Sequence, residues 1–290
     1  NKQFTQPINQ IAQISSMLQA MVAAAERVFE FLEQPEEIET AKGEIDTSKI
    51  KGNVEFKHVN FGYDEDKTII NDFSANIKEG QKIAIVGPTG AGKTTMVKLL
   101  MRFYDVNSGE INIDGHNIKD FKRGELRKMF GMVLQDTWLF GGTVKENIKY
   151  GNEEATDGEV IEAAKAAHVH HFIKTLPKGY NSILNEESSN VSAGQKQLLT
   201  IARVILANPK ILILDEATSN MDSISEREIL NYIKGIRDIT LILISHRINV
   251  IANSDCIYVL QKGNIVARGT DKQLKEQCKL YRQLYGEEEK

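Results

Sequence analysis

The hydrophobic pattern of the chain changes its period several times, and after residue 50 strand-like and helix-like stretches alternate. Short β-branched runs bounded by turn residues predict strands, and apolar residues that recur every three or four positions predict helices. The predicted strands are Val54–Val59, Ile69–Ile77, Lys82–Val86, Glu110–Asp114, Gly131–Leu134, Ile211–Leu214, Leu241–Ile244 and Ile257–Leu260. The predicted helices are Lys93–Phe103, Asp157–Ala167, Ala193–Leu206 and Ser223–Gly235.

The order of these elements indicates the fold class. Strand-rich sequence comes first, and strands then alternate with helices. Such an order predicts an α/β core with a parallel sheet and an additional antiparallel edge.

A different pattern occupies the first 34 residues. No charged residue occurs from Gln3 to Ala25, a run as long as a membrane-spanning helix, but the run is rich in amides and hydroxyls. Two interpretations remain open: a helix packed on its own domain or on a partner helix, or the cytoplasmic end of a transmembrane helix whose upstream part is absent. The apolar residues form one stripe of an amphipathic helix that ends near Pro35: Ile8, Ile11, Ile14, Leu18, Met21, Ala25, Val28 and Leu32.

Composition narrows the class of protein. The chain has 290 residues, of which 41% are hydrophobic and 26% charged, values typical of a globular protein that can bury a sizeable core. The formal net charge of -4 gives no reason to expect a nucleic-acid partner. The two cysteines form no CxxC pair, which favours a reducing compartment. Because the sequence begins with Asn1, we interpret it as a fragment of a longer protein.

The run Gly87–Thr94 matches the phosphate-binding pattern GxxxxGK[ST] between a predicted strand and a predicted helix. In this pattern backbone N–H groups and the helix dipole attract a phosphate, Lys93 reaches the β- and γ-phosphate oxygens, and the Thr94 hydroxyl ligates Mg²⁺. A Gly-rich turn without a ligand is the weaker alternative. The pattern by itself therefore predicts nucleotide binding with Mg²⁺, and we expect ATP to bind at Thr89, Gly90, Ala91, Gly92, Lys93, Thr94 and Thr95 once the motifs below are added.

Two carboxylates follow the apolar strand Ile211–Leu214. Acidic residues in this place often cap the next helix, so the pair alone is a weak signal. Together with the phosphate-binding pattern it indicates nucleotide hydrolysis. Asp215 would then hold Mg²⁺, largely through water, and Glu216 would polarise the attacking water.

The segment Val191–Gln195 reads Val-Ser-Ala-Gly-Gln and precedes a predicted helix. Ser192 and Gln195 fit a capping box, which is its structural interpretation. With Gln135 after one strand, Asp222 after the acidic pair and His246 after another strand, however, the set resembles the nucleotide-binding domain of ABC transporters. The resemblance covers about residues 50–285 and implies a P-loop NTPase core, an antiparallel β subdomain and a helical subdomain that carries the signature motif.

The resemblance also implies a role for each matching residue. Tyr63 would stack on adenine, with Phe61 as the alternative of a core aromatic. Gln135 would sense Mg²⁺, His246 would contact the γ-phosphate, and Glu216, His246, Lys93 and Gln135 would form the catalytic set. The motif residues Ser192, Gly194 and Gln195 would contact ATP bound to a second subunit, and Asp222 would lie at the dimer seam. The family works as a head-to-tail dimer with two composite sites.

The parent protein is expected to be an exporter. The segment Asp136–Ile148 resembles the stretch that touches the membrane domain in ABC exporters, and the N-terminal helix resembles their last transmembrane helix as it leaves the membrane. We therefore expect the end of that helix at residues 1–35, a linker at 36–50 and the ATPase domain at 51–290, with a helical subdomain at about 136–209. This domain would lie at the cytoplasmic face of the cell membrane, attached through the missing transmembrane domain.

Three departures from the family pattern slightly favour a heterodimer over a homodimer. The signature has Val191 and Ala193 where the family prefers Leu and Gly, the segment 184–190 lacks the TEVGERG-like sequence of homodimeric exporters, and Asn220-Met221 replaces Ala-Leu. The rival function is an ABC ATPase without a membrane domain that acts on nucleic acid or ribosomes. A third is a nucleotide-gated switch without turnover, which would require the loss of Glu216 or His246.

Overall fold

The computed structural model describes residues 2–34, 36, 41, 45–64, 67–134, 137–185, 190–217, 223–235 and 238–285, with side chains except at 2–5, 223–225, 233 and 234. The chain divides into two compact units, residues 1–39 and 40–290.

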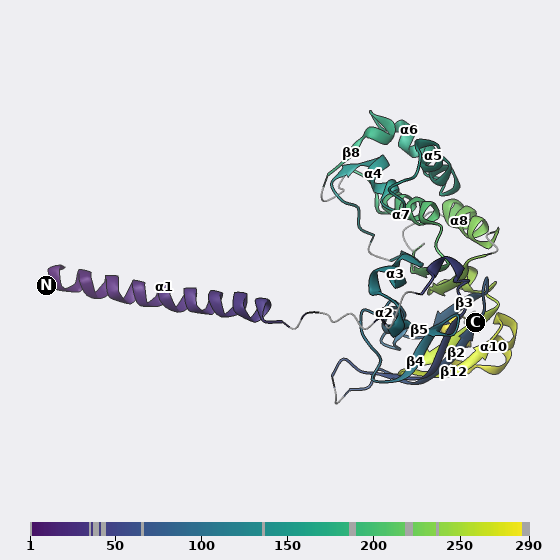
Figure 1. The fold of residues 1–290 in the computed structure, drawn as a ribbon, viewed down its shortest axis with the longest axis horizontal. Helices are drawn as coiled ribbons and strands as arrows, with labels where there is room; N and C mark the ends of the chain where they lie inside the picture. Colours follow the sequence, from purple (N-terminus) through teal and green to yellow (C-terminus); the bar gives the residue numbers. More distant parts are fainter. Residues whose placement is uncertain are drawn as a thin grey trace. The chain divides into compact units, whose positions relative to one another are not determined.

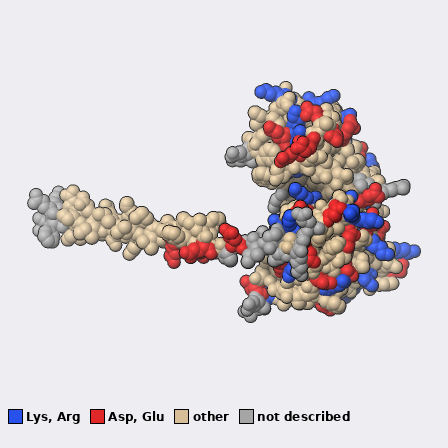
Figure 2. Space-filling model, in the orientation of Figure 1, with Lys and Arg blue, Asp and Glu red and all other residues tan. Residues whose placement is uncertain are grey.

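The first unit consists of one long helix, α1 (Lys2–Leu32), with Pro7 inside it. Its predicted apolar stripe is present on the helix, and the stripe residues from Ile8 to Leu32 are exposed. Figure 2 shows the helix almost free of charged side chains, apart from an acidic cluster toward its C-terminal end. Among the described residues, no helix combines the length and the apolar character needed to cross a membrane.

The second unit contains a four-stranded antiparallel sheet that is formed early in the chain (Figure 1). Its order is β2 (Ile70–Ile77), β1 (Val54–Phe61), β4 (Ser108–Ile113) and β5 (His116–Asn117). Apolar side chains alternate with polar ones along β2, so one face of this sheet is buried.

A six-stranded sheet forms the centre of this unit. Its order is β12 (Asn264–Gly269), β11 (Cys256–Gln261), β3 (Lys82–Val86), β10 (Thr240–Ile244), β9 (Ile211–Asp215) and β6 (Phe130–Val133). The five strands from β11 to β6 are parallel, and β12 pairs antiparallel at the edge.

The central strands are apolar on both faces because each face borders a different core. In β9, Ile211 and Ile213 belong to the core shared with the antiparallel sheet, whereas Leu212 and Leu214 belong to the core on the other side. That second core contains residues of elements that follow β6: α4 (Val144–Lys149), α5 (Asp157–Ala166), α6 (His170–Thr175), β8 (Ile183–Leu184), α7 (Ala193–Ala207) and α8 (Ser223–Gly235). The small strand β7 (Gly142–Thr143) pairs antiparallel with β8 in the same region of the chain.

The remaining elements are short apart from the helix after the phosphate loop. They are α2 (Lys93–Leu100), α3 (Arg123–Lys128), α9 (Ile248–Ile251), α10 (Asp271–Gln277), α11 (Lys279–Tyr285) and 3₁₀ turns at Thr47–Lys49, Ile118–Asp120 and Gly179–Asn181. The topology agrees with the predicted α/β architecture of a parallel sheet, an antiparallel β subdomain and a helical region.

Two sequence predictions need correction. The helix predicted at Lys93–Phe103 ends at Leu100, because Arg102 adopts a left-handed conformation (φ 52°) and its buried guanidinium donates to Asp105 and to the Phe121 carbonyl. Strand β12 was not predicted, because its apolar residues Ile265, Val266 and Ala267 are consecutive rather than alternating with polar ones.

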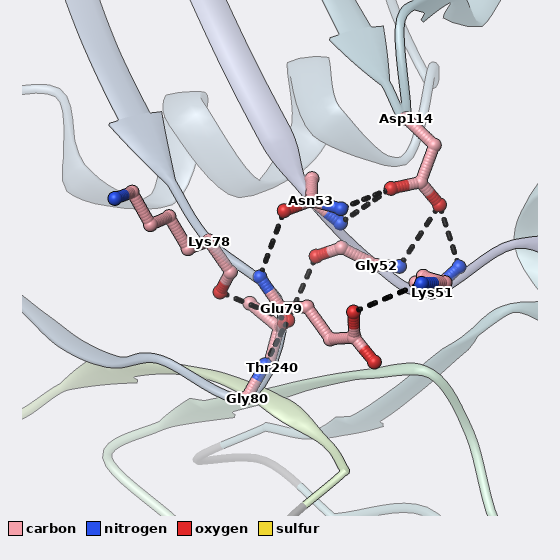
Figure 3. A network of polar contacts seen from close by, with 8 residues as sticks. All are labelled: Lys51, Gly52, Asn53, Lys78, Glu79, Gly80, Asp114 and Thr240. Atoms are coloured by element: carbon pink, nitrogen blue, oxygen red, sulfur yellow. Dashed lines mark hydrogen bonds and ion pairs between the residues drawn. The ribbon is translucent and has the colours of Figure 1, made fainter.

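The start of β1 is held by a network of polar contacts from three other segments (Figure 3). The carboxylate of Asp114 accepts hydrogen bonds from the backbone N–H groups of Lys51 (2.6 Å), Gly52 (3.1 Å) and Asn53 (3.1 Å). On the opposite side of this segment, the Thr240 hydroxyl donates to the Gly52 carbonyl at 2.7 Å. The residues that lead into β1 are therefore fixed to both sheets.

Candidate functional site

The carboxyl ends of three neighbouring parallel strands meet at one edge of the six-stranded sheet. Strand β10 lies between β3 and β9, and Ile244 pairs with Ile85 on one side and with Asp215 on the other. The phosphate loop follows β3, the acidic pair ends β9, and His246 follows β10. Because parallel strands end at the same edge, the sheet brings together groups that are far apart in the sequence.

A cavity of about 550 Å³ opens at this edge, a size suitable for a small ligand. Phosphate-loop residues, the acidic pair and His246 share it with residues that no motif had indicated. The lining consists of Lys67, Thr68, Ile69, Thr89, Gly90, Gly92, Lys93, Thr94, Thr95, Asp215, Glu216, His246 and Lys262.

The phosphate loop is shaped by its backbone before any ligand binds. Gly92 precedes α2 in a left-handed conformation (φ 102°) that strains any residue with a side chain, and a Cβ atom there would also lie 2.6 Å from Cδ1 of Ile70. The Lys93 ammonium donates to the carbonyls of Gly87 (2.7 Å) and Pro88 (3.1 Å). The lysine is therefore held over the loop, at the N-terminus of the helix where an anion is favoured.

Burial shifts the pKa values of two charged groups in the site. It lowers the pKa of Lys93, against the opposing charges of Glu216 and Asp215. It raises the pKa of Asp215, and the charge of Glu216 raises it further, while Lys93 and a hydrogen bond from Thr94 lower it. The ionised Asp215 is thus poorly compensated within this chain.

The donor set fits a magnesium ion. Thr94 and Asp215 both line the cavity, and hydroxyl and carboxylate oxygens of this kind are ligands that Mg²⁺ prefers. A divalent cation would also place a compensating positive charge beside the ionised Asp215. The third predicted ligand, Gln135, lies outside the described residues.

Glu216 and His246 face each other in the cavity. Nε2 of His246 lies 3.2 Å from Oε1 of Glu216. Glu216 adopts a left-handed conformation (φ 50°), and its backbone N–H donates to the Ile244 carbonyl at 2.8 Å. Strained backbone in a non-glycine residue occurs often at active sites. The loop before His246 is held in turn by the Tyr285 hydroxyl, which donates to the Ser245 carbonyl at 2.8 Å.

Tyr63 and Phe61 occupy different environments. Phe61 is buried in the core at 4% exposure, whereas Tyr63 is 43% exposed. The Tyr63 hydroxyl lies 3.5 Å from the Thr95 hydroxyl, and its ring packs edge-on against Phe61 and Tyr104. Of the two candidate aromatics, Tyr63 is therefore the exposed one beside the phosphate loop, and Nζ of Lys98 lies over its ring at 5.7 Å from the centroid.

The signature residues lie at the start of α7 and outside the cavity. Ser192 caps this helix: its hydroxyl accepts from the Gln195 N–H at 3.2 Å, and the Gln195 side chain accepts from the Ser192 N–H at 2.9 Å. The capping box expected from the sequence is therefore present in the structure. Neither residue, nor Gly194, lines the cavity of its own chain. Asp222, the segment 186–189 and Asn220-Met221 lie outside the described residues.

Comparisons with known proteins extend this picture. The family model described as ABC transporter matches residues 70–219. The chain is 48% identical over 284 residues to the fatty acid ABC transporter ATP-binding/permease protein of Mycobacterium tuberculosis, covering 98% of this chain and 45% of that protein. It is 42% identical to the ATP-dependent lipid A-core flippase of Coxiella burnetii, covering 96% of this chain and 48% of that protein.

A solved structure, that of a bacterial Atm1-family ABC exporter with ATP bound, superposes with a TM-score of 0.83 at 35% identity. The match covers 98% of this chain and 50% of that one. The chain thus spans about half the length of the relatives that it matches.

Proposed function

The chain belongs to the ABC transporter family, and on that premise we propose that it is the ATP-hydrolysing motor domain of an exporter. The resemblance inferred from the motifs and the predicted α/β ABC ATPase fold are both confirmed. The single observation that supports hydrolysis most strongly is the Glu216–His246 pair in one cavity with Lys93.

In the proposed mechanism Glu216 accepts a proton from the water that attacks the γ-phosphate, and its contact with His246 orients the carboxylate. His246 and Lys93 then stabilise the negative charge that develops on the γ-phosphate oxygens. Bound Mg²⁺, held by Thr94, Asp215 and Gln135, would supply further charge neutralisation. Positioning and electrostatic stabilisation supply most of the rate.

ATP binding would use the remaining predicted residues. The backbone N–H groups from Thr89 to Thr95 surround the phosphates, and phosphate oxygens replace the Gly87 and Pro88 carbonyls as partners of Lys93. Tyr63 stacks on adenine with its exposed face.

A second nucleotide-binding domain would complete the site. Ser192, Gly194 and Gln195 line no part of this chain's cavity but stand at a helix N-terminus, which suits a phosphate bound to another subunit. Asp222 would lie at the same seam. The two domains would associate head to tail.

The membrane attachment forms a further part of the proposal. Relatives described as ATP-binding/permease proteins are about twice as long as this chain, and α1 carries an exposed apolar stripe. We assign residues 1–35 to the end of the last transmembrane helix, 36–50 to a linker and 51–290 to the motor domain, with its helical subdomain at about 136–209. The motor domain would lie at the cytoplasmic face of the membrane.

The partner domain would belong to a different chain. The three departures at Val191/Ala193, in segment 184–190 and at Asn220-Met221 support this heterodimer proposal. The full-length protein reconstituted alone should then transport poorly, and robust ATP-driven transport by a homodimer would refute it.

The rival function, an ABC ATPase acting on nucleic acid, has little support in the charge distribution. Lysine and arginine are interspersed with aspartate and glutamate over the face shown in Figure 2, rather than gathered in a basic stripe.

The variant Glu216→Gln tests the proposed hydrolysis. Removal of the base should leave ATP binding intact, lower turnover by at least about 100-fold and accumulate an ATP-bound dimer. Turnover is measured by phosphate release and the dimer by light scattering after size exclusion. Glu153→Gln, an exposed matched control, should behave like the parent. Hydrolysis by Glu216→Gln at the parental rate would show that Glu216 is not the base.

A further inference from the structure

The turn between β11 and β12 has an unusual residue for its backbone shape. Two residues, Lys262 and Gly263, connect the strands, and both have positive φ angles of 48° and 79°. Two-residue hairpin turns of this kind strongly favour Asn-Gly, because asparagine tolerates the left-handed region better than most residues with a side chain. Lysine here departs from the local preference, which suggests that its side chain has another role.

The backbone of this turn is fixed against the phosphate loop and the start of β2. The Gly263 N–H donates to the Ala91 carbonyl (3.2 Å), and the Asn71 N–H donates to the Gly263 carbonyl (3.0 Å). A Cβ atom on Gly263 would lie 2.0 Å from the Ile69 carbonyl oxygen, so the approach is too close for any other residue. The Asn71 side chain also donates to the Lys262 carbonyl at 3.3 Å. The backbone of Lys262 is therefore held in place by the phosphate loop and by the start of β2.

Lys262 is one of the residues that line the nucleotide cavity, and so is Lys67, just before β2. Both residues are exposed, and neither makes an ion pair or side-chain hydrogen bond with the part of the chain that the structure describes. Lys93, in contrast, is already engaged with loop carbonyls. Among the described residues, these two exposed lysines of the cavity wall thus have no side-chain partner.

The ligand proposed above is a polyanion, and it must enter a cavity that contains Asp215 and Glu216 in a protein of net charge -4. Cations at the wall of a concave site offset this repulsion and accelerate the association of an anion. We propose that Lys262, assisted by Lys67, is an anion-capture residue that binds the polyphosphate of the incoming nucleotide, separately from Lys93. This inference rests on the proposed ATP-binding function.

Stopped-flow binding of a fluorescent ATP analogue to the whole chain, at several ionic strengths, tests the inference. Lys262→Gln should lower the association rate constant by at least about threefold and weaken its dependence on salt. Lys67→Gln should act in the same direction, and Lys262→Arg should retain binding. Lys174→Gln, which removes an exposed charge on α6 away from the cavity, is the matched control and should bind like the parent.

Lys262→Asn separates capture from a purely structural role of the turn. Asparagine suits the left-handed conformation, so Tm should rise while nucleotide association slows. Unchanged association in Lys262→Gln, or parental association in Lys262→Asn, would overturn the inference while the proposed function stands. A parental chain that binds no ATP would overturn both.

Discussion

Asp215 combines its proposed role in holding Mg²⁺ with an energetic penalty. Burial and the charge of Glu216 raise its pKa in the folded chain, so the folded state holds the proton more tightly than the unfolded state. Between the ordinary carboxyl pKa and this raised value, stability falls as pH rises, and the loss remains in full above the raised value. The charge that would hold Mg²⁺ therefore destabilises the chain at neutral pH.

The variant Asp215→Asn should separate these two effects. Without the buried charge, Tm in the absence of nucleotide should rise at pH 7, and the gain should shrink as pH is lowered toward the ordinary carboxyl pKa. Magnesium affinity, measured by titration in the presence of ATP, should fall by at least about tenfold. A lower Tm at pH 7 would contradict the assigned direction of the pKa.

At the scale of elements, Asp114 fixes the segment through which the chain enters the first strand (Figure 3). Burial alone would raise the pKa of its carboxyl, but hydrogen bonds from Asn53, Gly52 and Lys51 outweigh it and hold the pKa below its usual range. A lowered pKa contributes stability above the ordinary value that is lost as pH falls through the folded value. The hydrogen bonds to Asp114 therefore weaken only when acid protonates its carboxylate.

Asp114→Ala should free this segment. Three backbone donors lose a charged acceptor, and we expect a loss of about 2 kcal/mol in the free energy of unfolding by urea. Amide hydrogen exchange should accelerate at Lys51, Gly52 and Asn53. Asp238→Ala removes an exposed carboxylate and serves as the control. Unchanged exchange at these amides would show that Asp114 does not hold the segment.

Helix α7 has the signature residues at its start and, near its end, an arginine that bonds to the preceding segment of the chain. Arg203 donates from Nε to the Asn147 carbonyl (2.8 Å), from Nη2 to the Asn147 side chain (3.0 Å) and from Nη1 to the Trp138 carbonyl (3.3 Å). The Asn147 amide in turn bonds both backbone groups of Phe140. One planar guanidinium thus ties the 138–147 loop to α7.

Arg203→Met should loosen this loop, and Arg203→Lys should not rescue it, because a single ammonium cannot reproduce the fork. Trp138 is the chain's sole tryptophan and is 64% exposed, so its fluorescence anisotropy reports the loop directly and should fall in both variants. Arg227→Met, on the exposed side of α8, should leave the signal unchanged. Full rescue by lysine would show that charge, not the fork, holds the loop.

At the scale of the whole molecule, Ser192 has one role inside its chain and a proposed one in another. Aspartate is as good a helix cap as serine, so Ser192→Asp should preserve Tm. Its charge would, however, repel a γ-phosphate on the partner. In the Glu216→Gln background, the ATP-dependent dimer should therefore disappear while each chain still binds ATP. Thr270→Asp changes the equivalent capping box of α10 and should leave the dimer intact. A persistent dimer in Ser192→Asp would argue against the contact.

Contiguous features were readable from the sequence for a physical reason. A phosphate loop must present successive N–H groups, so its residues are neighbours in the chain, and buried parallel strands must be apolar on both faces. Residues Gly87–Thr94 and the runs that became β3, β9 and β10 were therefore visible without a structure. Elements of two residues, such as β5 and β7, were missed because their patterns are too brief to have a period, and β12 was missed because its apolar residues are consecutive rather than alternating.

The sequence by itself determined the family and the α/β class and supplied the proposed reacting groups, since each depends on local pattern. Only the tertiary structure decided which groups share a cavity: it placed Glu216 beside His246 and left Tyr63, not Phe61, exposed. It also brought Lys67 and Lys262, from opposite ends of the domain, to the same cavity. The physical reason is that sheet order and packing, which no local pattern encodes, set the distances between segments remote in the chain.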